Sequence, residues 1–282
     1  MALNVIDVSD NNGTIDWNNV SADGAIIKCG YRGYATAGTL NIDSKFKENA
    51  AGAAAAGIPF GVYWISQAIS DEEAEEEAEY VLDLIKDYSL SYPVYLDSEW
   101  SHEVHNGRAD TISRARKTQY ALTWLKAIEA AGYTAGVYAC ESWLYGSSRM
   151  LAVEELTDYT LWVAKYSTTK PYIGGISYDA WQYTKTGSDS GTSGNTDQSY
   201  FYRDFPAERI EAEVAALTDD EFDEYMDRWL ERQQEKEGSS WSEDDREWAV
   251  SEGLFQGDEN GNYMWRSSVT REQLAAVLHR QA

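Results

Sequence analysis

Two acidic residues follow a run of strand-forming residues in the segment YPVYLDSEW, residues 92–100. Side chains alternate between the two faces of a strand, so Asp97 and Glu99 point the same way with only Ser98 between them. Two carboxylates this close repel each other, and partial burial raises their pKa further, so one can hold a proton near neutral pH while the other stays ionised. General acid catalysis requires a carboxyl group that retains its proton in this way. The alternative is a solvated strand end with two exposed acids.

The composition of the 282-residue chain restricts the partners that it can bind. It carries 23 Lys and Arg against 48 Asp and Glu, a net charge of -25 at pH 7. This charge opposes direct binding to nucleic acid or to an anionic membrane surface. The chain also has 11 Trp and 20 Tyr, whose rings with one polar edge suit the faces of sugars as well as ordinary cores. We therefore expect a neutral or cationic partner.

Strand-like and helix-like segments alternate up to about residue 202. Near-continuous apolar runs, which suit a parallel sheet buried on both faces, occur at residues 4–9, 24–31, 60–66, 93–99, 135–140, 161–167 and 179–184. Between several of them the sequence predicts helices, one closed by Gly57, one opened by Ser70 and one closed by Gly132. Helices shorten after residue 140. The pattern predicts an α/β fold, an irregular β/α barrel of the TIM type.

Four acids lie where such a barrel performs its chemistry, at the carboxyl ends of its strands. Asp7 ends the first strand, Asp97 and Glu99 end the fourth, and Asp197 lies where an eighth strand would close the barrel. Aromatic residues occupy comparable strand ends: Tyr63, Trp64, Tyr138, Trp162, Trp181 and Tyr183. Four acids and an aromatic rim at one mouth indicate a glycosidase cleft.

Six segments resemble, in order and spacing, the family 25 glycoside hydrolases, the muramidases also called Chalaropsis-type lysozymes. They are VIDVSDNNGTIDW, FGVYWISQA, PVYLDSEW, GVYACESWL, LWVAKY and AWQYT, the last followed by Asp197. The resemblance covers residues 3–203. It implies an incomplete, irregular barrel that hydrolyses the β-1,4 bond between N-acetylmuramic acid and N-acetylglucosamine in peptidoglycan.

The resemblance also assigns roles to the acids. Glu99 would be the general acid that protonates the leaving oxygen and later the base that activates water. Asp97 would either orient or polarise the substrate 2-acetamido group or act as the nucleophile. Asp7 and Asp197 would complete the acidic cluster, by contacting substrate or by tuning Glu99.

The aromatic residues are weaker candidates than the acids. Tyr63, Trp64, Tyr138 and Trp162 are candidate substrate contacts at the mouth of the barrel. Trp181 is a further candidate that could equally belong to the core.

The remaining chemistry of the chain is sparse. Cys29 and Cys140 lie in apolar strand-like runs, so we expect both to be reduced and buried. The few His and Cys lack the spacing of metal ligands, and we expect no metal and no cofactor. The chain opens MALNVIDVSD without a basic and apolar leader, which predicts synthesis in the cytoplasm without a signal peptide and action on the cell wall after release or export.

The C-terminal part differs in composition from the barrel. We expect the catalytic barrel to span residues 1–205, an acidic helical linker residues 206–237 and a small helical module residues 238–282. The last segment, with EWAVSEGLFQGD, GN and VTREQLAAVLHR, resembles a single S-layer homology motif. That resemblance implies attachment to a secondary cell-wall polymer, with Arg271 as the most suggestive residue. A packing or dimerisation module is the alternative.

Two functions stay open at this point. The first is an active muramidase acting on peptidoglycan, encoded by a phage or prophage as an endolysin. The second is a non-catalytic wall protein that uses the barrel cleft to bind glycan. Glu99 together with Asp97 and Asp7 favours catalysis, because binding alone does not need a cluster of mutually repelling acids.

Overall fold

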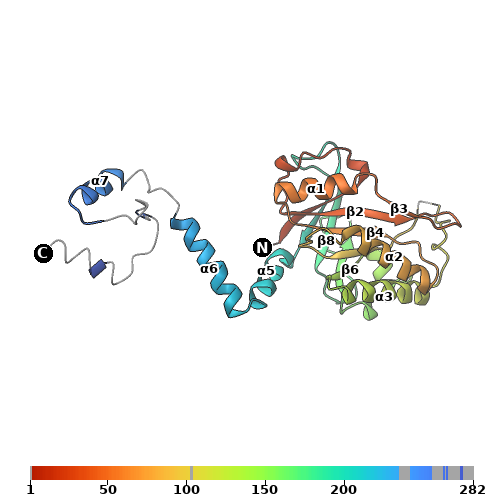
Figure 1. Ribbon diagram of the computed structural model, residues 1–282. Helices are drawn as coiled ribbons and strands as arrows, with labels where there is room; N and C mark the ends of the chain where they lie inside the picture. Colours follow the sequence, from red (N-terminus) through yellow and green to blue (C-terminus); the bar gives the residue numbers. More distant parts are fainter. Residues whose placement is uncertain are drawn as a thin grey trace. The chain divides into compact units, whose positions relative to one another are not determined.

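Figure 1 shows a computed structural model of the protein, which describes residues 2–101, 104–234 and 242–255 together with residues 263, 265, 274 and 275. The chain divides into two compact units, residues 1–210 and 211–282. The first unit contains every candidate residue of the acidic cluster and its aromatic rim. The predicted further boundary at residue 237 stays a prediction, and Arg271 lies outside the described residues.

The first unit is a closed barrel of eight strands. Seven strands run parallel, each beside the next: β1 (Leu3–Val8), β2 (Gly24–Arg32), β4 (Phe60–Ile65), β5 (Val94–Asp97), β6 (Ala135–Cys140), β7 (Thr160–Ala164) and β8 (Ala180–Gly187). β9 (Thr196–Phe201) is antiparallel to both β8 and β1 and closes the ring. The short β3 (Leu40–Ile42) extends β2 outside the ring. This architecture confirms the expected irregular β/α barrel.

The direction of β9 determines where Asp197 lies. An antiparallel strand begins at the end of the barrel where the parallel strands finish. Asp197, the second residue of β9, therefore pairs in register with Asp7 near the end of β1. The sequence predicted the closing strand but not its reversed direction.

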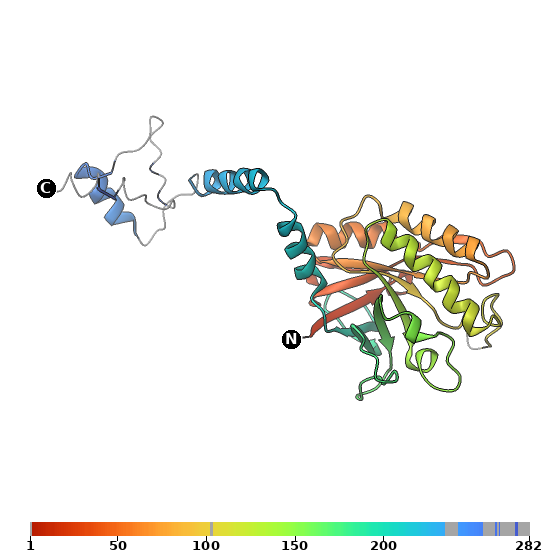
Figure 2. The same ribbon diagram turned by 90° about the horizontal axis from the view of Figure 1, so that it is seen from below.

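Three long helices cover one side of the barrel (Figure 2): α1 (Phe46–Ala56), α2 (Asp71–Ile85) and α3 (Arg114–Ala130). The predicted end signals have clear structural roles. The Ser70 hydroxyl accepts a hydrogen bond from the Glu73 N–H at the start of α2, and Gly57 ends α1 in the left-handed conformation with φ +71°. After β6 the helices shorten to α4 (Glu141–Leu144) and a 3-10 turn (Val153–Glu155), as the sequence predicts.

The core of the barrel unit has two parts. One lies between the strands and the covering helices, and the other fills the barrel interior around Tyr95, Trp162 and Phe201. Trp64 belongs to the outer part, is fully buried and packs against Tyr80 of α2, with ring centroids 5.6 Å apart. The prediction that Trp64 contacts substrate is therefore wrong.

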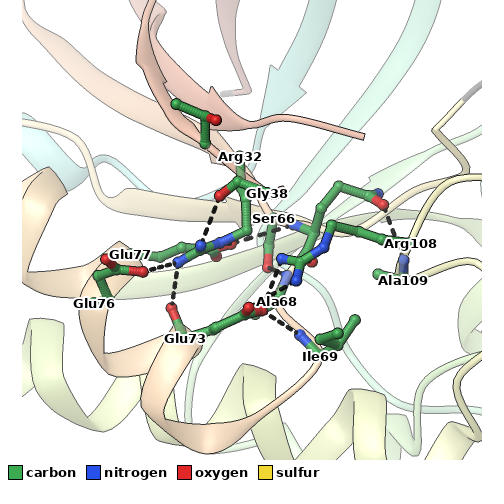
Figure 3. Close-up of polar contacts among 12 residues, drawn as sticks. Arg32, Gly38, Ser66, Ala68, Ile69, Glu73, Glu76, Glu77, Arg108 and Ala109 are labelled. Atoms are coloured by element: carbon green, nitrogen blue, oxygen red, sulfur yellow. Dashed lines mark hydrogen bonds and ion pairs between the residues drawn. The ribbon is translucent and has the colours of Figure 1, made fainter. Parts of the chain in front are cut away.

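A buried ion pair joins the end of β2 to α2 (Figure 3). Arg32 Nε lies 2.7 Å from Glu77 Oε1, and both side chains are almost completely buried. The same guanidinium donates to Glu76 and to the backbone oxygen of Gly38, at 2.7 and 2.8 Å. Burial raises the pKa of Glu77 to about 6, against the lowering effect of Arg32. Removing one partner of such a pair leaves a buried charge alone, which typically costs about 3–5 kcal/mol.

A second arginine extends this network toward the segment that follows β5. Arg108 forms two hydrogen bonds with the Glu73 carboxylate, at 2.7 and 2.8 Å, and a longer one with the Gln67 backbone oxygen. The Gln67 side-chain oxygen in turn accepts from the Ala109 N–H. Two loops and the start of α2 are thereby fixed to one another.

The second unit is largely helical in its described part. α5 (Phe205–Ala215) starts in the first unit, and α6 (Asp219–Gln234) follows a break at which Thr218 and Glu221 form a capping box. The apolar residues of α6 are exposed, among them Tyr225 and Trp229. α7 (Glu243–Ser251) comes next. In the described part of the chain, no helix is both long and apolar enough to cross a membrane.

Candidate active site

A pocket of about 180 Å³ opens at the carboxyl ends of the parallel strands, and we call it the acidic pocket. It brings together all four acids that the sequence singled out. Its lining consists of Asp7, Asn11, Lys28, Tyr63, Ile65, Asp97, Glu99, Tyr138, Trp162, Tyr166, Gln182 and Asp197.

The strand register positions the acids. Asp97 is the last residue of β5, and its neighbours across the sheet are Ile65 in β4 and Tyr138 in β6. Asp7 lies one residue before the end of β1, opposite Asp197. Glu99 lies just beyond β5 and lines the same pocket. The sequence prediction that Asp97 and Glu99 act as a pair is therefore supported by their position.

Gln182 links the members of the pocket and was missed by the sequence reasoning. Its side-chain nitrogen donates to Asp7 at 3.0 Å and to Asp197 at 3.3 Å. Its side-chain oxygen accepts from the hydroxyls of Tyr138 and Tyr166, at 2.7 and 3.0 Å. The available signal was strand alternation in AWQYT, because a polar side chain between two outward aromatic residues must point into the barrel.

The two most buried acids of the acidic pocket, Asp7 and Asp97, are in environments that disfavour a negative charge. Burial raises the pKa of Asp7 well above its ordinary value, and the nearby Asp197 raises it further, whereas the hydrogen bond from Gln182 lowers it. Burial likewise raises the pKa of Asp97, followed by repulsion from Glu99. The pocket therefore favours retaining protons over full ionisation.

The other two acids are less enclosed. Glu99 has much of its surface open to solvent at the mouth of the pocket, but protein atoms crowd its carboxyl group. This crowding raises the pKa of Glu99, Lys28 lowers it, and Asp197 raises it again. Burial raises the pKa of the half-buried Asp197 to about 6. An accessible carboxyl group that retains its proton toward neutral pH suits a general acid.

One carboxylate oxygen in the pocket lacks a partner. Asp97 is 4% exposed, and its Oδ1 atom is buried without a hydrogen-bond partner among the described residues. A buried acceptor left unsatisfied costs free energy, so such an atom is either a weakness of the fold or a contact reserved for a ligand.

The strand face on which a candidate aromatic residue lies decides whether it reaches the acidic pocket. Tyr63, Tyr138 and Trp162 line the acidic pocket, as expected. Trp181 lies on the opposite face of β8 from Gln182, where it is buried and its indole N–H donates to the Lys165 backbone oxygen at 2.8 Å. It is a core residue, so its prediction as a substrate contact is wrong. Tyr166, which follows β7, lines the pocket and was missed by the sequence reasoning.

The two cysteines are both free thiols, as predicted. Cys29 is fully buried, and its burial raises the pKa of the thiol beyond the neutral range. Cys140 is only partly buried, at the end of β6 where the strand leaves the core. The prediction of complete burial is therefore wrong for Cys140.

An α/β barrel with carboxylates clustered at its strand ends defines a class, the barrel glycoside hydrolases, which work with a pair of Asp or Glu residues. The family model of the glycosyl hydrolases family 25 matches residues 6–192. The chain belongs to this family. The matched stretch contains Asp7, Asp97 and Glu99 and ends before Asp197.

Individual relatives agree with this assignment. The chain is 31% identical over 202 residues to the autolytic lysozyme of Clostridium acetobutylicum, covering 70% of this chain and 55% of the relative. Among solved structures, the modular autolysin LytC from Streptococcus pneumoniae, in complex with a synthetic peptidoglycan ligand, matches with a TM-score of 0.62 and 29% identity over 71% of this chain and 47% of that one. The chain thus spans about half the length of these relatives.

Two further structures extend the comparison. The CTP1L endolysin matches with a TM-score of 0.58 and 25% identity, covering 74% of this chain and 70% of that one. The lysozyme from Streptomyces coelicolor matches at 20% identity and a TM-score of 0.56, over 72% of this chain and 93% of that one, and supports the fold alone.

The raised pKa values predict a stability that depends on the charge of the pocket. The pKa of Asp7 is higher in the folded state than its value near 3.8 in the unfolded state. The bound proton therefore stabilises the fold fully at a pH below 3.8, and this contribution is lost as the pH rises through the folded-state pKa. Asp7→Asn removes this ionisation but retains an oxygen for Gln182. We expect it to stabilise the protein at pH 7 by about 0.5–2 kcal/mol.

Urea unfolding of the wild type and Asp7→Asn at pH 4 and pH 7 measures this effect. The difference in unfolding free energy should grow from the lower to the higher pH. Asp10→Asn, at an acid on the rim of the barrel, serves as the matched control. An Asp7→Asn variant that is less stable than the wild type at pH 7 would contradict the account of the pocket.

Proposed function

We propose that this protein is a peptidoglycan muramidase that hydrolyses the β-1,4 bond between N-acetylmuramic acid and N-acetylglucosamine. The observation that carries the proposal is the acidic pocket, in which the accessible Glu99 lies beside the buried Asp97 in a family 25 barrel. The ligand of the similar S. pneumoniae autolysin, a synthetic peptidoglycan fragment, supports the choice of substrate.

In this proposal Glu99 is the general acid. Its carboxyl group protonates the glycosidic oxygen as the bond to C1 breaks, and the resulting carboxylate then takes a proton from the attacking water. Its exposed position at the mouth of the pocket gives it access to both the leaving group and water. The nearby Lys28 stabilises the carboxylate form that exists between the two steps.

The unpartnered oxygen of Asp97 favours one of the two roles that the resemblance left open. A buried Oδ1 can accept the N–H of the substrate 2-acetamido group. That contact would orient the acetamido oxygen toward C1, so that it attacks as the leaving group departs and is released when water adds. Attack by Asp97 itself would instead require the same oxygen to reach C1. We therefore assign Asp97 the orienting role.

The reacting residues, Glu99 and Asp97, are positioned and tuned by three neighbours: Asp7, Asp197 and Gln182. The Gln182 amide joins the two Asp residues, so a proton or a substrate hydroxyl can be shared among them. Their negative field also raises the pKa of Asp97 and Glu99, which helps Glu99 retain the catalytic proton.

Binding without catalysis is the competing function. A cleft that only bound glycan would gain nothing from four acids that raise one another's pKa, since neutral amides would bind sugar hydroxyls without this electrostatic cost. The acidic pocket therefore favours hydrolysis.

We also propose an origin and a site of action. The similarity to the CTP1L endolysin supports a phage or prophage endolysin that acts on the cell wall after release or export. Isolating the protein from lysing host cells and locating it on the wall by immunogold labelling would test both. A protein recovered only from intact cytoplasm would contradict them.

The replacement Glu99→Gln tests the catalytic proposal. The amide is nearly isosteric but cannot donate the proton, so we expect turnover to fall by about 10²- to 10⁴-fold with unchanged folding. Glu79→Gln, at an exposed site on α2, is the matched control. Wild-type activity should also decline as the pH rises through the pKa of Glu99, since the proton is then lost.

The measurement is the release of reducing ends from purified cell walls, with mass spectrometry to identify the new sugar end. Fragments ending in reducing N-acetylmuramic acid are expected. Undiminished release by Glu99→Gln would remove Glu99 from the role of general acid.

The C-terminal segment, residues 238–282, is proposed to bind a secondary cell-wall polymer on the strength of its S-layer homology resemblance. If so, full-length protein should sediment with intact walls more strongly than a chain ending at residue 210, and Arg271→Ala should remove most of the difference. Equal sedimentation at low and high salt, together with a dimer mass for the full-length protein and a monomer mass for the truncated chain, would instead identify a dimerisation module.

A further inference from the structure

A second, larger hollow adjoins the acidic pocket, and we call it the side pocket. Its volume is about 650 Å³, within the range of typical ligand sites. Asn11 and Lys28 line both pockets, so the two share a boundary. The catalytic scheme above makes no use of the side pocket.

The lining of the side pocket has the chemistry of a sugar site. Tyr31 and Tyr34 stack with ring centroids 6.1 Å apart and planes inclined by 26°, and the side chains of Asn11 and Asn41 supply amide groups beside them. Aromatic faces bind the C–H faces of pyranose rings, and amides bind their hydroxyl and acetamido groups. Lys28 Nζ lies 5.1 Å from the centre of the Tyr31 ring.

The charges of the two pockets favour a neutral ligand. Asp10 lines the side pocket, and four carboxyl groups line the acidic pocket next to it. Lys28 is the single cation among the residues that line either one. An anionic peptide stem, or the lactyl carboxylate of N-acetylmuramic acid, would meet more repulsion than attraction here, whereas an N-acetylglucosamine ring carries no charge.

Two hydrogen bonds from arginines fix the backbone of the segment that forms one wall of the side pocket. The Arg108 backbone N–H donates to the Tyr34 oxygen at 3.1 Å, and the Arg32 guanidinium donates to the Gly38 oxygen at 2.8 Å. Gly38 has φ +55°, and a side chain there would collide with the Arg108 guanidinium. The segment from Tyr34 to Gly38 is therefore closely fitted to the two arginines.

The arginines are themselves fixed by α2 (Figure 3). Arg108 makes its paired hydrogen bonds to Glu73, and Arg32 makes its buried ion pair with Glu77. A binding wall fixed in advance loses little conformational freedom when ligand arrives. The network thus gives the side pocket a preformed shape, which an incidental surface hollow would not need.

We propose that the side pocket binds a sugar ring of the glycan strand beyond the disaccharide at the cleaved bond, with Tyr34 as a contact and Arg108 as a residue that positions the wall. The proposal rests on the muramidase function above. It gives the enzyme a preference for longer glycan strands, because only these reach from the acidic pocket into the side pocket.

The test compares kcat/KM for two soluble substrates, a tetrasaccharide and an octasaccharide of alternating N-acetylglucosamine and N-acetylmuramic acid without peptide stems. Tyr34→Ala should lower the ratio of the long-substrate to the short-substrate kcat/KM by about tenfold, as expected for a buried aromatic contact. The control is Tyr200→Ala. Tyr200 of β9 stacks on Tyr183 of β8, and both lie outside the two pockets. The ratio of this variant should equal that of the wild type.

Arg108→Ala tests the positioning role. We expect KM for the octasaccharide to rise while kcat changes little, and Arg108→Lys to restore part of the loss. A purely structural role would lower kcat/KM equally for both substrates, together with the melting temperature, and would overturn the assignment of Arg108.

The outcomes separate this inference from the proposed function. If the wild type cleaves neither substrate, the proposed function fails. If it cleaves both and Tyr34→Ala keeps the wild-type ratio, the side pocket does not bind glycan. If Tyr34→Ala changes the ratio only when the two substrates are measured again with peptide stems attached, the occupant is the peptide, and the sugar assignment is wrong.

Discussion

The accumulation of negative charge in one small pocket is the constraint on which the rest of the structure depends. Asp7, Asp97, Glu99 and Asp197 are brought together by strands that are far apart in the sequence. Burial raises the pKa of each, and repulsion from neighbouring acids raises it further for Asp7, Asp97 and Glu99. A fold can hold such a group only if its scaffold is stable enough to offset the cost, and here a closed barrel with apolar packing both inside the ring and under the covering helices provides that stability.

Much of this arrangement could be predicted from the sequence because it follows from local patterns. Apolar runs of strand length identified the parallel strands, and Ser70 and Gly57 marked helix ends through their own backbone preferences. Asp7, Asp97 and Glu99 were found because each follows or interrupts such a run, and Asp197 because it lies where a closing strand was expected. Alternation would also have separated Gln182 from Trp181, had it been applied to every strand.

Other features depend on contacts between distant segments and leave little trace in the sequence. The direction of β9 is set by its pairing with β1 and β8. Alternation places the adjacent Tyr63 and Trp64 on opposite faces of β4, but which of the two faces is covered depends on the packing of α2, where Trp64 contacts Tyr80. An acidic run such as the one that starts α2 is typical of a solvated helix N-terminus, yet its Glu73 and Glu77 pair with Arg108 and Arg32.

The buried arginines connect the stability of the barrel to the shape of its mouth. They join α2 to the loop after β2 and to the segment after Glu99, so the same ion pairs that fix the helix also fix the walls around the substrate. Buried pairs of this kind contribute little net stability compared with apolar packing. Their value here is geometric, because they keep polar loops in one conformation next to the reacting groups.

The most direct test of the central claim is a titration of the pocket carboxyl groups by carbon-13 nuclear magnetic resonance of protein labelled at its Asp and Glu side chains. Signals would be assigned with the Glu99→Gln and Asp97→Asn variants. The account predicts that the signal of Glu99 titrates above the ordinary value of 4.5, and that its midpoint falls when Asp197 is replaced by Asn. Titration of all four pocket acids at or below their ordinary values would contradict it.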